Sequence, residues 1–185
     1  MKGTLPPDAP PAADGVLISA QQIAARVAEM GARITADYAG RDLVLVTLLR
    51  GGVFFLSDLC RAIDLPLRLD FMAVSSFAHS VQAGAVRITK DLDEDIRGAS
   101  VIVVEDLVDT GLTLNYLLGV LRAREPATIE IAALLDREVR RIADLPIAYR
   151  GFRVPDRFVA GYGLDLRGCY RNLGYVATLT DEVIS

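Results

Sequence analysis

The chain has 185 residues, of which 52% are hydrophobic, and a formal net charge of −4. This length suits one domain that buries roughly 70% of its unfolded surface. The acidic balance argues against a nucleic-acid-binding protein. The N-terminal residues are rich in proline rather than apolar, and no apolar run is long enough to span a membrane, so we expect a cytoplasmic protein with no membrane partner. Cys60 and Cys169 lack the spacing of metal ligands, which fits reduced thiols.

Residues 1–15 contain four prolines among small residues and show no hydrophobic periodicity. We therefore predict a disordered N-terminal tail, followed by a single domain at residues 16–185. Ser19 and Gln22 form a capping-box pattern, and apolar residues at helical spacing then predict a helix that ends near Gly40.

Buried strands alternate with helical segments along the rest of the chain. Runs of β-branched and other apolar residues predict strands at Asp42–Leu49, Leu67–Ser75, Val101–Val104 and Ile129–Leu135. Helical spacing follows the first of these at Val53–Ile63 and the third from Leu114 onward. This alternation predicts a doubly wound α/β fold, with a mainly parallel sheet flanked by helices. Residues 137–185, which contain extended segments and prolines, are expected to form most of a small hood beside the sheet.

The central motif follows the strand at Val101–Val104. Glu105, Asp106 and Asp109 come first, and Thr110-Gly111-Leu112-Thr113 then leads into a helix. A glycine turn at a helix N-terminus lets backbone amides and threonine hydroxyls approach a phosphate. Carboxylates can accept hydrogen bonds from vicinal hydroxyls or hold Mg²⁺ through water. The motif therefore predicts a site for a ribose 5-phosphate, and the alternative is an ordinary acidic turn.

The segment Val103–Leu114 resembles the ribose-phosphate loop of the type I phosphoribosyltransferases. The similarity extends from about Leu17 to Leu179 and is closest to the bacterial hypoxanthine (hypoxanthine-guanine) branch. Four further blocks carry it, namely Leu49–Gly52, Asp70–Ser76, Lys90–Gly98 and Gly161–Asp165.

The resemblance implies transfer of a phosphoribosyl group from 5-phospho-α-D-ribose 1-diphosphate (PRPP) to N9 of hypoxanthine or guanine, with Mg²⁺ as cofactor. It also implies a homo-oligomer, either a dimer or a tetramer. Two alternatives stay open: a phosphoribosyltransferase for xanthine or another base, and a non-catalytic regulator that senses PRPP.

The resemblance also assigns roles to residues that match the family's motifs. Asp109 is implied to be the catalytic proton acceptor, and Asp165 the Mg²⁺-associated carboxylate, with Glu105 and Asp106 able to act through water. The ribose-phosphate site is implied to consist of Glu105, Asp106, Asp109, Thr110, Gly111, Leu112 and Thr113. Pyrophosphate contacts are implied for Arg50, Gly51 and Arg171, and purine contacts for Arg137, Phe158 and Val159. The resemblance leaves open whether Leu49–Arg50 or Arg50–Gly51 is a cis peptide bond.

Two positions depart from the family pattern. Arg137 and Glu138 stand where the family has Lys and then Pro, and the family Lys donates to the 6-oxo group of the base. Arg137 either donates to the O6 and N7 edge of an oxopurine or turns toward solvent. Phe77 stands where the family usually has Tyr, which predicts weaker closure of the loop over the reaction centre. The single histidine, His79, has no expected role.

Overall fold

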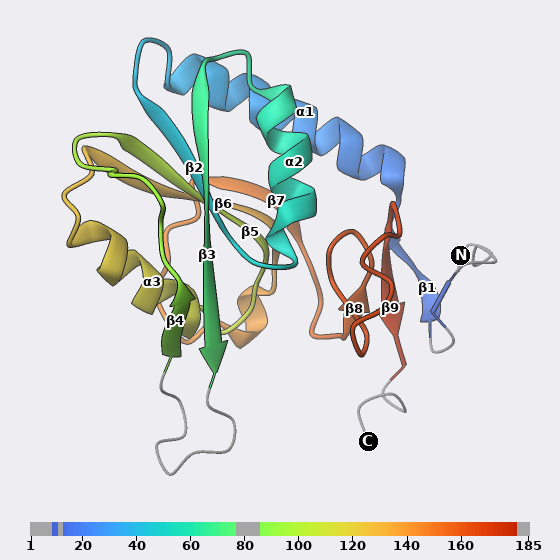
Figure 1. The fold of residues 1–185 in the computed structure, drawn as a ribbon. Helices are drawn as coiled ribbons and strands as arrows, with labels where there is room; N and C mark the ends of the chain where they lie inside the picture. Colours follow the sequence, from blue (N-terminus) through green and yellow to red (C-terminus); the bar gives the residue numbers. More distant parts are fainter. Residues whose placement is uncertain (1–8, 11–12, 77–85, 181–185) are drawn as a thin grey trace.

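The computed structural model describes residues 9–10, 13–76 and 86–180, and this part of the chain forms two β-sheets and three α-helices (Figure 1). The larger sheet contains, in spatial order, β4 (Val86–Lys90), β3 (Leu67–Ser76), β2 (Leu43–Leu48), β5 (Ser100–Val108), β6 (Thr128–Asp136) and β7 (Tyr149–Arg153). The smaller sheet contains β1 (Ala13–Ile18), β9 (Val176–Leu179) and β8 (Val159–Ala160). The helices are α1 (Ala20–Asp37), α2 (Gly52–Ala62) and α3 (Leu112–Arg122).

The larger sheet is parallel except for β4, which pairs antiparallel with β3. Alternate residues of β2 and β5 face opposite sides, and both sides are buried. One core contains Leu45 and Ile102 together with residues of α1 and α2. The other contains Val46 and Val103 together with the buried leucines of α3. The doubly wound α/β fold is confirmed, and burial on both faces explains the uninterrupted apolar runs in these strands.

Helix α1 begins at the predicted capping box, in which the Ser19 hydroxyl accepts a hydrogen bond from the Gln22 amide and the Gln22 side chain accepts from the Ser19 amide. The helix then crosses α2 at Gly31, where a β-carbon would lie 2.4 Å from the carbonyl oxygen of Ala62. The absence of a side chain at Gly31 therefore allows the two backbones to approach closely.

Two predicted boundaries are wrong. Ala13–Gly15 were expected in the disordered tail, but they belong to β1, which pairs with β9. The pairing partner lies more than 150 residues away in sequence, so local periodicity carries no sign of it. Residues 1–8 and 11–12 of the predicted tail lie outside the described residues. β7 was expected in the hood, but it joins the larger sheet beside β6.

Strand β5 continues beyond the predicted end at Val104, because β6 still pairs with it as far as Val108. The register with β2 ends earlier, at the pair Thr47 and Val104. The residues from Glu105 onward therefore have a strand neighbour on one side only. The order of the strands also reverses at this point of the sheet, because β3 lies beside β2 on one side and β5 lies beside it on the other. Such a switch point is where open α/β sheets bind ligands.

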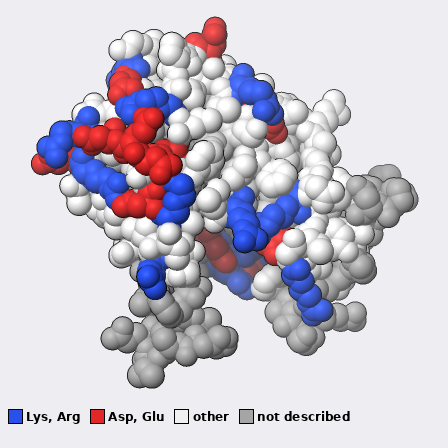
Figure 2. Space-filling view, in the orientation of Figure 1, with Lys and Arg blue, Asp and Glu red and all other residues white. Residues whose placement is uncertain are grey.

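The acidic run Asp91–Asp95 is interleaved with basic side chains. Figure 2 shows acidic and basic side chains mixed in this way over one part of the surface. Arg124 pairs with Asp91, Lys90 with Asp93 and Arg68 with Glu94. Ile96 anchors the segment and is fully buried. These ion pairs and the buried anchor fit a solvated surface turn. None of the described helices is long and apolar enough to cross a membrane.

We predict that Gly31→Ala lowers the free energy of unfolding by about 1–3 kcal/mol, because the added methyl group overpacks the α1–α2 crossing. Gly119→Ala in α3 is the matched control. A β-carbon there meets nothing within 4 Å, so the higher helix propensity of alanine should leave stability equal or raise it by up to about 1 kcal/mol. Urea unfolding of both variants measures the difference, and equal stability of the two variants would contradict the close-packed crossing.

Candidate functional site

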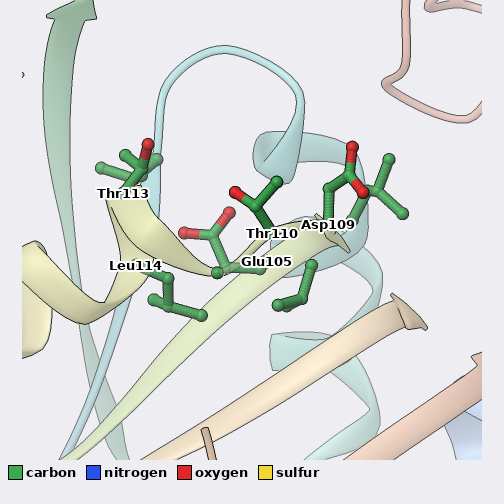
Figure 3. Close-up of a pocket in the computed structure, with 9 residues that line it drawn as sticks. Glu105, Asp109, Thr110, Thr113 and Leu114 are labelled. Carbon is green, nitrogen blue, oxygen red and sulfur yellow. The ribbon is translucent and has the colours of Figure 1, made fainter. Parts of the chain in front are cut away.

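A cavity of about 170 Å³ lies at the switch point, between the end of β2 and the turn that joins β5 to α3. It is lined by Leu48, Glu105, Leu107, Val108, Asp109, Thr110, Gly111, Thr113 and Leu114. Figure 3 shows Thr113 and Asp109 at the two ends of this group, with Glu105 and Thr110 between them. The structure thus brings together most of the residues predicted to hold ribose phosphate.

The turn at Thr110 and Gly111 is held by the segment that follows β6. Gly111 has φ of +79° and directly precedes α3. A β-carbon there would lie 2.7 Å from Cδ1 of Leu145, the end of a flexible side chain that can shift, so the positive φ is what requires glycine. The Thr110 carbonyl accepts hydrogen bonds from the Ile142 and Ala143 amides, at 2.9 and 3.1 Å. The N-cap residue has no side chain, and the first amide of α3, that of Leu112, donates only a long hydrogen bond of 3.5 Å to the Thr110 hydroxyl. This end of the helix is therefore suited to an anion.

Glu105 and Asp106 occupy a poorly hydrated position. Glu105 is buried, and its Oε1 has no hydrogen-bond partner among the described residues. Burial, reinforced by the neighbouring carboxylate of Asp106, raises the pKa of Glu105 well above its usual value. Burial also raises the pKa of Asp106, although its Oδ1 accepts a hydrogen bond of 2.8 Å from the Leu107 amide. A bound cation or a hydroxyl donor would stabilise the ionised form of these two neighbouring carboxyl groups.

A second group lies where β2, β5 and the loop after β8 meet. A β-carbon on Gly51 would lie 1.8 Å from Oδ2 of Asp106, and a β-carbon on Gly163 would lie 2.3 Å from the Gly51 carbonyl oxygen. Arg171 donates to the Gly163 carbonyl at 2.5 Å, and its other terminal nitrogen lies 2.5 Å from Oδ1 of Asp165. Gly51, Asp106, Asp165 and Arg171, which come from three separate sequence blocks, therefore form one cluster.

Arg137 lies inside the protein beside Asp109 and is not turned toward solvent. Its side chain is 4% exposed. One terminal nitrogen donates to Oδ2 of Asp109 at 3.1 Å, and the other donates to the Arg157 carbonyl at 2.6 Å. The Nε of Arg137 and the Oδ1 of Asp109 are both buried without a hydrogen-bond partner in the described part of the chain. A donor on Arg137 and an acceptor on its partner Asp109 are thus left unpaired in a buried position, which costs stability in the unliganded protein.

Phe158 presents an exposed ring near this pair, with 40% of the residue accessible. The guanidinium of Arg140 lies 5.9 Å from the ring centroid, and one of its nitrogens lies 3.9 Å from Oδ2 of Asp109. Val159 is buried in β8, where it pairs with Thr178 of β9. Phe158 and Val159, two of the three predicted purine residues, therefore directly follow Arg157, whose carbonyl accepts a hydrogen bond from Arg137.

Three arginines near the site were not singled out from the sequence. Arg141 donates to the carbonyls of Asp109 and Val108, and it also pairs with the fully buried Asp136. Arg140 and Arg157 make the contacts described above. The sequence signal was the basic group directly after β6, in which Arg137, Arg140 and Arg141 fall within five residues.

Arg50 is exposed at the end of β2, and the Leu49–Arg50 peptide bond is cis. This decides between the two bonds that the sequence left open. Phe77 and His79 lie outside the described residues. Within those residues, no group of three or more His, Cys, Asp or Glu side chains has the arrangement of a complete protein metal site.

Comparisons with known proteins agree on one family. A family model described as the phosphoribosyl transferase domain matches residues 17–167. The hypoxanthine-guanine phosphoribosyltransferase of Mycobacterium avium is 49% identical over 175 residues, which cover 91% of this chain and 86% of that protein. The hypoxanthine phosphoribosyltransferase of Haemophilus influenzae is 46% identical over 171 residues, covering 90% and 96%. A crystal structure of a hypoxanthine phosphoribosyltransferase from Staphylococcus aureus superimposes with a TM-score of 0.89 at 42% identity, covering 94% of this chain and 95% of that one.

The raised pKa of Glu105 predicts that Glu105→Gln stabilises the unliganded protein. A carboxyl group whose pKa is raised by folding costs no stability below its unfolded pKa, and it destabilises the fold progressively as the pH rises toward the folded pKa. The gain from glutamine should therefore be small near pH 4 and grow to about 0.5–2 kcal/mol at pH 8. Urea unfolding of both proteins at several pH values measures it. A difference that does not change with pH would show that burial of the carboxylate is not the cause.

Proposed function

The chain belongs to the phosphoribosyl transferase family, and we propose that it transfers the 5-phosphoribosyl group of PRPP to N9 of hypoxanthine or guanine. The products would be inosine or guanosine monophosphate and pyrophosphate, as in purine salvage. The curated relatives named above carry hypoxanthine or hypoxanthine-guanine phosphoribosyltransferase names over most of this chain. Its fold is the type I phosphoribosyltransferase fold of its structural neighbours.

The observation that carries the choice of base is the unpaired donor and acceptor of Arg137 and Asp109. An oxopurine offers an acceptor, O6, beside N7, which carries a proton when the base is bound in the tautomer that leaves N9 free to attack. We assign the contact with O6 to the Arg137 guanidinium and the contact with the N7 proton to the Asp109 carboxylate. Adenine places an amino group at the O6 position, so a donor would face a donor and both would stay unpaired.

Asp109 would then act as the proton acceptor as N9 attacks C1′ of the ribose. Arg137 donates to the other carboxylate oxygen, which fixes the orientation of the carboxylate toward the base. The exposed ring of Phe158 is available to stack on the base, and a contact of this kind is worth about 1–3 kcal/mol. The backbone of Val159 would contact the edge of the base.

The remaining residues would bind PRPP. The first amides of α3, with Thr110, Gly111, Leu112 and Thr113, would hold the 5′-phosphate. Glu105 and Asp106 would accept hydrogen bonds from the ribose hydroxyls, since Oε1 of Glu105 is buried without a partner in the described chain. Arg50, the Gly51 backbone and Arg171 would bind the pyrophosphate group, whose negative charge grows as the bond to C1′ breaks. Fixed positive charge placed where charge develops is usually a large catalytic term.

We include Mg²⁺ as cofactor, because the donor set fits it. Glu105, Asp106 and Asp165 supply hard carboxylate oxygens. Burial is the main cause of the raised pKa of Asp106, Arg171 opposes it and Asp165 adds to it, so a cation would stabilise the ionised carboxylate at this position. Mg²⁺ binds through one or two carboxylates together with waters and substrate phosphates. When bound, it would neutralise charge on the leaving pyrophosphate. We also propose a cytoplasmic homo-oligomer, either a dimer or a tetramer.

The function is tested by measuring the release of pyrophosphate from PRPP in the presence of Mg²⁺, with hypoxanthine, guanine, xanthine, adenine or uracil as the base. We expect turnover with hypoxanthine or guanine, and a kcat/KM for adenine that is lower by about 10³-fold or more. Turnover with xanthine alone would move the function to another base. PRPP binding without turnover of any base would indicate a regulator.

The role of Asp109 is tested by Asp109→Asn, which keeps the shape of the side chain but not its basicity. We expect kcat to fall by about 10²- to 10⁴-fold, while the dissociation constant for PRPP changes little. Steady-state kinetics and calorimetric PRPP binding separate the two effects. Equal losses in kcat and in PRPP affinity would instead indicate a binding role.

A further inference from the structure

The turn at residues 155–158 carries two features of the base site. It supplies the exposed ring of Phe158 and the Arg157 carbonyl, which accepts a hydrogen bond of 2.6 Å from Arg137. A hydrogen bond from the Arg157 amide to the Pro155 carbonyl closes the turn at 2.9 Å. The position of this turn therefore determines both the stacking surface and one of the two anchors of Arg137.

The side chain of Arg157 leads away from the base site into the smaller sheet. Its terminal nitrogen lies 2.5 Å from Oδ2 of Asp14 in β1 and 3.3 Å from the Leu179 carbonyl of β9. The other carboxylate oxygen of Asp14 accepts a hydrogen bond from the Thr178 hydroxyl of β9. One carboxylate thus connects both strands to the turn.

The Asp14 end of this connection is largely buried, whereas the Arg157 side chain is 40% exposed. The Asp14 side chain is 17% exposed, and it has partners on both of its oxygens. The Leu179 amide also donates to the Phe158 carbonyl at 2.8 Å, so β9 holds the turn at a second point. An Arg157 side chain fixed at its far end limits how its backbone carbonyl can rotate.

We propose that Asp14, in the N-terminal strand, is a positioning residue for base recognition. It acts through Arg157, whose carbonyl orients the Arg137 guanidinium against Asp109. Asp14 is not among the residues that line the cavity, and its contact with Arg157 leads to the turn that carries Phe158, so we expect its effect in the base half of the site. This inference rests on the proposed function, because it assigns Arg137 to the purine.

The test compares Asp14→Asn with the wild-type protein. We expect KM for hypoxanthine and the dissociation constant for inosine monophosphate to rise by about three- to tenfold, the effect of one lost charge-assisted contact. The preference for hypoxanthine over adenine should fall, while the dissociation constant for PRPP stays within about twofold of the wild type. Asp14→Glu, which keeps the carboxylate, should recover most of the loss. Arg157→Gln removes the same contact from the other side and should behave like Asp14→Asn.

Asp37→Asn is the matched control, because Asp37, at the end of α1, accepts a hydrogen bond of 2.8 Å from the Tyr149 hydroxyl of β7 and lies 3.6 Å from Arg33, so it contacts neither the smaller sheet nor the 155–158 turn through these bonds. It should alter thermal stability without changing base affinity. Equal effects of Asp14→Asn and Asp37→Asn on inosine monophosphate binding would overturn the inference. A wild-type protein that binds PRPP but neither inosine nor guanosine monophosphate would instead overturn the proposed function.

Discussion

The contact between Arg137 and Asp109 is the constraint on which the base half of the site depends. A guanidinium that is 4% exposed is expensive to bury, and its charge is offset here by one carboxylate and one backbone carbonyl. The pairing is incomplete, since one nitrogen of Arg137 and one oxygen of Asp109 stay without partners in the described structure. Folding thus holds a donor and an acceptor in place before any ligand arrives. Such preorganisation costs stability in the free protein and increases affinity for a complementary ligand.

The rest of the fold keeps this pair in place. β6 delivers Arg137, and the longer pairing of β5 with β6 than with β2 opens the cavity beside Asp109. Arg141 ties the backbone of the β5–α3 turn to the buried Asp136. In the part of the site proposed for PRPP, Glu105 resembles Arg137 and Asp109, because folding also buries its Oε1 without a hydrogen-bond partner in the described structure.

The sequence was sufficient to predict the layers of the fold, because buried parallel strands and amphipathic helices leave clear patterns. The capping box at Ser19 and the turn at Gly111 were also readable, since each depends on residues close together in the chain. The wrong boundaries depend on distant pairing. β1 exists through its register with β9, and β7 through its register with β6. Neither pairing can be inferred from a few neighbouring residues.

In the site, too, features set by neighbouring residues could be predicted, and features set by distant segments could not. The resemblance assigned roles to Asp109 and Arg137. The position of the Arg137 side chain, however, depends on the distant 155–158 turn, because the Arg157 carbonyl accepts a hydrogen bond from it. The most direct measurement is a crystal structure of the protein with inosine monophosphate. We predict that O6 lies within hydrogen-bond distance of Arg137 and N7 within hydrogen-bond distance of Asp109. A base bound with Arg137 turned away from it, or with its O6 edge toward other residues, would contradict the account.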